Sequence, residues 1–65
     1  MIYERIHEYC KKESISITEF ERRCQIGNGV VGKWKKGKTE PSIRILEKIQ
    51  NATGLSIGYW VGGSL

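Results

Sequence analysis

Apolar side chains recur at the spacing of an α-helix in five successive segments of this chain. In the first segment they are Ile2, Ile6, Tyr9 and Cys10. This 3.6-residue period is typical of a helix with one buried face. Glu4 near the start and two lysines near the end suit the helix dipole. The pattern predicts a first helix over residues 2–12.

The next two segments predict a pair of helices joined by a tight turn. Ser16 and Glu19 form a capping-box pattern, in which the Ser16 hydroxyl accepts the Glu19 amide and the Glu19 carboxylate returns to Ser16. The second helix then runs from residue 17 to about 24, followed by a turn over residues 25–28. A third helix is predicted over 28–36, with Gly37 as its stop.

The last two segments predict a fourth helix after the only proline and a short fifth helix capped by Ser56. The fourth helix ends at Gly54, and its expected buried side chains are Ile43, Leu46, Ile49 and either Ala52 or Thr53. The fifth carries Ile57, Trp60 and Val61. Five helices joined by short turns, without strand signals, predict an all-α, compact five-helix bundle. We expect one domain over residues 1–61, with 62–65 as a disordered tail or the start of a linker.

A chain of 65 residues is near the lower size limit for a domain that folds alone. It has neither a secretory signal nor an apolar run of about 20 residues, so we expect a soluble cytoplasmic protein. Cys10 and Cys24 lie on apolar faces, which favours buried reduced thiols over a disulfide or a metal pair. With only His7 in addition, the chain offers too few zinc ligands. We therefore expect no metal and no cofactor.

The positive charge is concentrated in one segment. The net charge is +4, and residues 22–38 hold six basic residues and no acid, whereas the rest of the chain has a balance of −2. Such a segment is typical of a polyanion-binding surface, although a solvated lysine face is the alternative. In the same segment Gly29 and Gly32 interrupt the predicted third helix, and each interior glycine costs about 1 kcal/mol.

The ordered pattern from residue 2 to 61 resembles the phage-repressor type of helix-turn-helix domain, the Cro/CI or Xre family. The matching apolar positions are Phe20, Cys24, Val31 and Trp34. The motif W-K-K-G-K closes the third helix, E-P-S opens the fourth and G-L-S-I opens the fifth. The resemblance implies a lambda-repressor-like fold whose third helix lies in the major groove of DNA.

Three residues depart from the pattern of that family. Glu21 replaces a small residue that usually packs between the two helices of the motif. Gln25 replaces a glycine with positive φ in the turn, unless Gly27 takes over the bend. Ile17 replaces a glutamine that often contacts DNA, so one customary contact is missing.

With Val31 and Trp34 turned inward, the opposite face of the third helix becomes the candidate base-reading surface. Its proposed base-reading residues are Asn28, Gly29, Gly32 and Lys33. Asparagine can bond adenine N6 and N7, lysine can donate to guanine O6 and N7, and Gly32 would let the backbone approach the groove. The alternative role of Asn28 is that of a helix cap.

Phosphate contacts are expected from flanking ammonium, guanidinium and hydroxyl groups. The candidates are Thr18, Lys35, Lys36, Lys38, Thr39, Ser42 and Arg44. The hydroxyl groups can also cap their own helices. On the fifth helix, Trp60 is expected to complete the core, while Ile57, Tyr59 and Val61 could form a twofold dimer interface or simply pack.

These patterns predict a sequence-specific, double-stranded DNA-binding transcriptional regulator and no enzyme. A homodimeric prophage or mobile-element repressor that binds a palindromic operator is the favoured form. One alternative is an antitoxin-like module that binds a protein and also its operator. Another is non-specific binding to nucleic acid or a membrane surface through the lysines alone.

Overall fold

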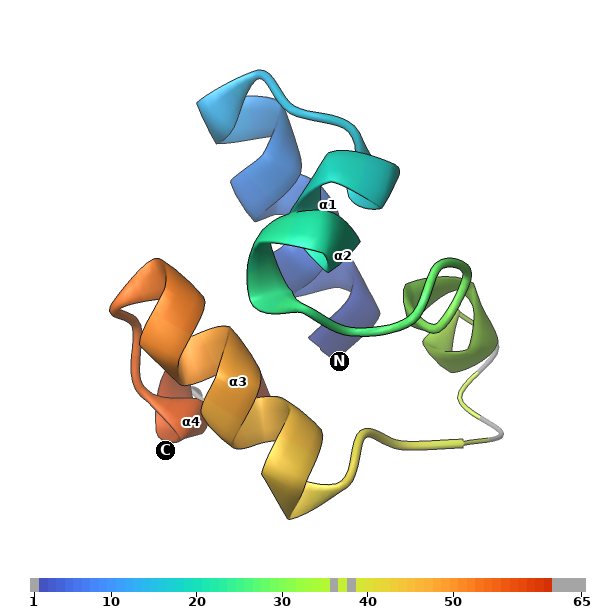
Figure 1. The fold of residues 1–65 in the computed structure, drawn as a ribbon, viewed down its shortest axis with the longest axis vertical. Coiled ribbons are helices and arrows are strands. Elements are labelled where there is room, and N and C mark those ends of the chain that lie inside the picture. The colour runs from blue at the N-terminus through green and yellow to red at the C-terminus, as the bar shows by residue number, and fades with distance from the viewer. Residues whose placement is uncertain (1, 36, 38, 62–65) are drawn as a thin grey trace.

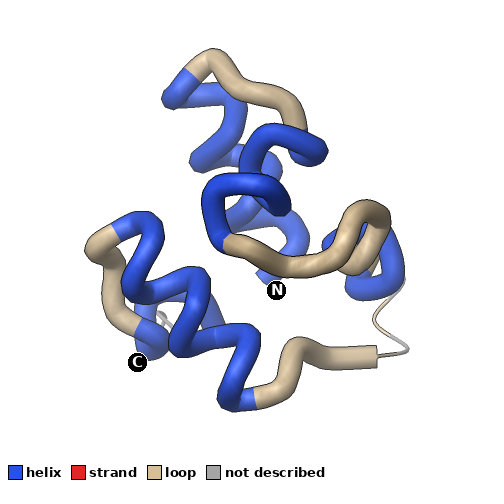
Figure 2. Tube along the Cα trace, in the orientation of Figure 1, coloured by secondary structure: helices blue, strands red, loops and turns tan. Residues whose placement is uncertain are grey.

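The computed structural model describes residues 2–35, 37 and 39–61, which contain four α-helices and one short 3₁₀ helix joined by turns and loops (Figure 1). In chain order they are α1 (Ile2–Glu13), α2 (Ile17–Cys24), the 3₁₀ helix η1 (Val31–Trp34), α3 (Ile43–Thr53) and α4 (Ile57–Val61). These residues form no strand (Figure 2), which confirms the all-α class. The expected tail over 62–65 lies outside them.

Serine hydroxyls cap the first turns of three of the helices, as the positions of these serines in the sequence predict. The acceptors are Ser16, Ser42 and Ser56, which cap α2, α3 and α4. Their oxygens lie 3.0, 3.3 and 3.2 Å from the backbone nitrogens of Glu19, Ile45 and Tyr59. Each bond satisfies an amide that has no partner within its own helix. At the other end of α3, Gly54 adopts a φ of 77° and donates its N–H to the Gln50 carbonyl.

The predicted capping box at α2 forms only in part. The Ser16 hydroxyl accepts the Glu19 amide, but the Glu19 carboxylate turns toward two basic side chains one helical turn further on. Its oxygens lie 3.2 Å from Arg22 Nη1 and 3.3 Å from Arg23 Nε. A charged guanidinium is a stronger partner for a carboxylate than a backbone amide is, which accounts for the difference.

Trp60 is fully buried and lies in an aromatic cluster that joins three helices. Its ring centroid is 5.6 Å from that of Tyr9 on α1 and 5.9 Å from that of Phe20 on α2, both in edge-to-face geometry. The other buried apolar residues are Ile2, Ile6, Cys10, Cys24, Val31, Trp34, Leu46 and Ile49. The core positions that the helix-turn-helix resemblance implied are therefore confirmed.

The inward face of α3 differs from the predicted one at its first turn. Ile43 was expected in the core, but 63% of its surface is exposed, while Ile45 packs partly against the core. Leu46 and Ile49 are buried as predicted. Apolar residues at 43 and 45 both fit the helical period. The packing of α3 against α2 and α4 turns residue 45, and not residue 43, toward the core.

Cys10 and Cys24 are both buried and free, as expected for reduced core thiols. Burial raises the pKa of the Cys10 thiol. It also raises the pKa of Cys24 to about 11, with a smaller contribution from the neighbouring Cys10. In the part of the chain that the structure describes, no helix has the length and apolar character needed to cross a bilayer.

Candidate nucleic-acid interface

The helix-turn-helix unit consists of α2, the connection over residues 25–30 and η1. Gln25 ends α2 in the left-handed region at φ 59° and ψ 39°. Its amide lies 3.1 Å from the Arg22 carbonyl, and the Ile26 amide lies 3.0 Å from the Glu21 carbonyl. Gln25 itself thus makes the bend that usually requires glycine, at a cost of about 1 kcal/mol.

The third helix is shorter than predicted and of a different type. Residues 28–30 form a turn, and the helix begins only at Val31, as a 3₁₀ helix that ends at Trp34. Gly29 has a φ of 87°, which cannot continue a right-handed helix. The three-residue step from Val31 to Trp34 matches the turn of a 3₁₀ helix as well as one face of an α-helix. The predicted α-helix over 28–36 is therefore wrong.

The side chain of Glu21 on α2 bonds to the backbone of the connection and of η1. Its side chain is only 2% exposed, although it is a carboxylate. One oxygen accepts the Gly29 amide at 3.0 Å, and the other accepts the Val31 amide at 2.9 Å. The acid thus occupies the position between α2 and η1 where the family usually has a small residue. In the sequence, the departure of Glu21 from the family pattern was the only indication of this link.

The four candidate base-reading residues all lie exposed on this unit, while Val31 and Trp34 point into the core. Asn28 and Gly29 belong to the turn before η1, and Gly32 and Lys33 belong to η1 itself. A Cβ atom added at Gly32 would meet no other atom within 4 Å. The four residues thus lie within one short, exposed segment of the chain.

Two of the phosphate candidates flank this segment directly. Thr18, exposed in the first turn of α2, lines a hollow of about 290 Å³ together with Asn28, Arg22 and Ile26. The Thr39 hydroxyl donates to the Lys33 carbonyl at 3.0 Å. Both hydroxyls thus lie next to the candidate base-reading residues.

The remaining phosphate candidates that the structure describes lie after η1 along the chain. Lys35 is exposed just after η1 and shares a hollow with Tyr3 and His7 of α1. Ser42 caps α3, and Arg44 is exposed in the first turn of that helix. Lys36 and Lys38 lie outside the described residues.

The three dimer candidates on α4 have different surroundings. Ile57 and Tyr59 pack partly against the core, and the Tyr59 ring lies under the Arg5 guanidinium at 5.1 Å. Val61 is 51% exposed. Of the three, Val61 thus offers the most free apolar surface.

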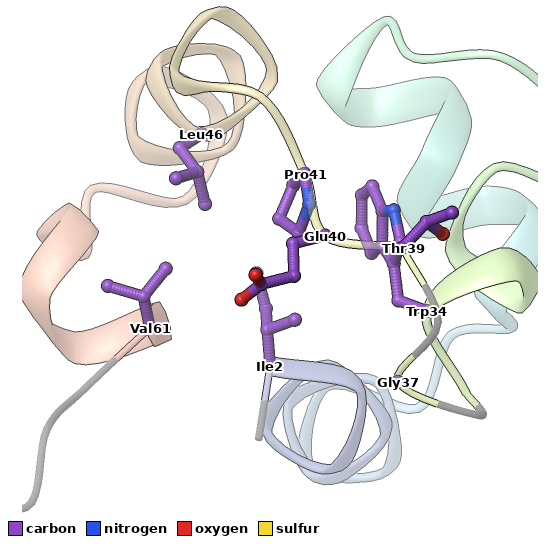
Figure 3. A pocket seen from close by; sticks show the side chains of 8 residues that line it. All are labelled: Ile2, Trp34, Gly37, Thr39, Glu40, Pro41, Leu46 and Val61. Atoms are coloured by element: carbon purple, nitrogen blue, oxygen red, sulfur yellow. The ribbon is translucent and has the colours of Figure 1, made fainter.

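A groove of about 300 Å³ lies between η1, the loop before α3 and the ends of α1 and α4 (Figure 3). Figure 3 shows Leu46 and Val61 on one side of it, Trp34 and Thr39 on the other, and the Glu40 side chain between them. Among the described residues that line the groove, Glu40 alone is ionisable. Within the described residues, the groove therefore offers Glu40 no second titratable side chain as an acid–base partner.

The part of the chain that contains α2, η1 and α3 matches a known protein family. A family model described as helix-turn-helix matches residues 6–60 of the chain. No match was found among curated proteins or among solved structures. Because the family model covers most of the chain, including α2, η1 and α3, the chain belongs to the helix-turn-helix family and is a DNA-binding regulator.

Proposed function

We propose that this protein is a sequence-specific transcriptional regulator that reads the major groove of duplex DNA, and that it acts as a repressor of a prophage or mobile element. The observation that carries the proposal is the grouping of Asn28, Gly29, Gly32 and Lys33 on one exposed segment, opposite the buried Val31 and Trp34. The repressor role is supported by the resemblance of the sequence to phage-repressor domains.

The chemistry of the exposed segment suits base edges. Asn28 offers one donor and one acceptor, the pair that adenine N7 and N6 require, and Lys33 offers donors for guanine O6 and N7. Gly29 and Gly32 add no side chain, which leaves space for the groove wall at the backbone. This segment can therefore contact bases without steric exclusion.

Phosphates would be held on both sides of the same segment. Thr18 lies beside Asn28, and Arg44 lies in the first turn of α3, after the loop that Thr39 ties to Lys33. Lys35 and Ser42, with Lys36 and Lys38, complete the proposed set. Contacts of this kind fix the register of a protein on DNA but carry no sequence information of their own.

We propose further that two copies bind together, with α4 at the twofold interface. Val61 supports this, because it is a large apolar side chain that is half exposed. Ile57 and Tyr59 would contribute their exposed parts. Twofold symmetry in the protein would require a near-palindromic operator, with half-site centres about 34 Å apart.

Selection from a pool of random-sequence duplexes, followed by sequencing, tests this function. The full chain should enrich a narrow, near-palindromic motif. Failure to enrich any sequence while the protein still binds DNA would overturn sequence-specific regulation and favour non-specific binding. Co-purification with a small protein from the same operon, without DNA preference, would favour the antitoxin alternative.

A further inference from the structure

We propose that Glu21 is a positioning residue for base reading, which holds the Asn28–Val31 segment in its reading conformation without touching DNA. The inference rests on the function proposed above. It concerns a residue on α2 that is almost completely buried and that the family pattern does not supply. Its consequence is that sequence discrimination depends on a side chain beneath the DNA-facing surface.

The two hydrogen bonds of Glu21 fix two peptide groups of the turn. The Gly29 amide belongs to the Asn28–Gly29 peptide, and the Val31 amide belongs to the Val30–Val31 peptide. Because a peptide group is planar, each bond fixes the orientation of a whole unit. The first of these units carries the Asn28 Cα atom, so the bond from Glu21 helps to set the direction of the Asn28 side chain.

The cost of leaving a buried carboxylate unpaired restricts the conformation of the turn. A buried carboxylate is costly unless charged or polar partners compensate it. In the described part of the chain, the basic side chains of α2 pair with Glu19, and the Glu21 carboxylate receives two backbone amides instead. Any movement of the turn would leave a buried charge without its partners. The hydrogen bonds between the carboxylate and the two amides therefore stabilise a single conformation of the turn.

Substitution of Glu21 by glutamine distinguishes the effect of positioning the turn from the effect of the negative charge on DNA affinity. Glu21→Gln keeps the size of the side chain, but its NH₂ group would face one of the two backbone amides, donor against donor. The same change removes a negative charge from the DNA-binding unit, which by itself should strengthen binding to every duplex. Positioning and charge thus predict effects of opposite sign on operator affinity.

The experiment compares the full-length wild-type chain with Glu21→Gln and with Glu13→Gln, an exposed charge-matched control at the end of α1. Affinity is measured for the selected operator and for an unrelated duplex of equal length. For Glu21→Gln we expect operator affinity to fall at least tenfold and affinity for the unrelated duplex to stay equal or rise. Glu13→Gln should retain the wild-type ratio.

Amide hydrogen exchange gives an independent measurement of the turn. In Glu21→Gln, the Gly29 and Val31 amides should exchange faster, while amides in α1 and α3 keep their wild-type rates. A wild-type chain without preference among duplexes would overturn the proposed function, and these exchange rates would still show whether Glu21 holds the turn.

Three results would overturn the positioning role. The first is an equal loss of affinity for both duplexes, and the second is unchanged operator affinity. The third is loss of helicity both in Glu21→Gln and in Glu21→Asp, which keeps the charge but shortens the side chain. In that case Glu21 would serve folding alone.

Discussion

The hydroxyl of Thr39 donates a hydrogen bond to the carbonyl oxygen of Lys33 across 3.0 Å. This bond ties the loop before α3 back to η1. Figure 1 shows η1 at one edge of the molecule, from which the chain crosses to α3. The first turn of α3, with Arg44, therefore follows a loop that is anchored to the proposed base-reading segment.

We expect Arg44 to bind a phosphate next to that segment. Arg44→Ala should weaken binding to every duplex, and the slope of log K against log salt should become shallower by about 0.9, the value for one phosphate contact. Lys12→Ala, which removes an exposed charge at the end of α1, should leave the slope unchanged. Equal slopes for Arg44→Ala and wild type would place Arg44 away from DNA.

The two glycines around η1 should respond in opposite ways to substitution by alanine. Gly29 has a φ of 87°, so an added Cβ costs about 1–2 kcal/mol even though the space around it is open. Gly32 lies in η1 without a positive φ and also in open space, so Gly32→Ala should raise the free energy of unfolding by up to about 1 kcal/mol. Denaturant unfolding of the two variants measures both values, and a destabilised Gly32→Ala would mean that this glycine serves backbone geometry.

The features that the sequence predicted well are those that depend on neighbouring residues. Ser16, Ser42 and Ser56 cap helices that start directly after them, and Gly37 and Gly54 adopt positive φ where helices were expected to stop. Such caps are decided within one helical turn. The burial of Trp34 and Trp60 was likewise predicted by the helical spacing of the apolar residues.

The features that the sequence could not predict depend on distant contacts. The third helix begins at residue 31 and not at 28: Gly29 adopts a positive φ, and the Glu21 carboxylate accepts the Gly29 and Val31 amides, eight and ten residues further along the chain. From residue types alone, an acid inside a helix indicates a solvent-facing position. Similarly, Ile43 is exposed because the packing of α3, and not its apolar period, selects the inward face.

Assembly should depend on Val61 if α4 forms the dimer interface. Val61→Asp places a charge on a side chain that is already half exposed, so the fold should persist while the dimer dissociates. Sedimentation without DNA should then shift toward the monomer, with unchanged helicity. Ile43→Asp, at the other large exposed apolar position among the described residues, is the control and should leave the sedimentation profile as in wild type. A wild-type chain that is monomeric both free and on DNA would contradict the proposed interface.

Stability should fall at alkaline pH because of the buried thiols. The pKa of Cys24 is raised from 9.0 to about 11 in the folded chain, mainly by burial. The unfolded chain then loses this proton first, so the free energy of unfolding should decrease as the pH rises from about 9 to 11. Denaturant unfolding under reducing conditions should show a flatter pH dependence for Cys24→Ala than for wild type. Parallel profiles for the two proteins would exclude Cys24 as a source of the fall.

Base reading by the turn before η1 can be measured directly by random-duplex selection with wild type, Asn28→Ala and Asn51→Ala in parallel. Asn51 is an exposed asparagine on α3, outside the helix-turn-helix unit. We expect Asn28→Ala to lose its preference at one base pair in each half-site, an A·T pair in wild type, and to keep the rest of the motif, while Asn51→Ala retains every position. Identical motifs for wild type and Asn28→Ala would contradict base reading by this residue.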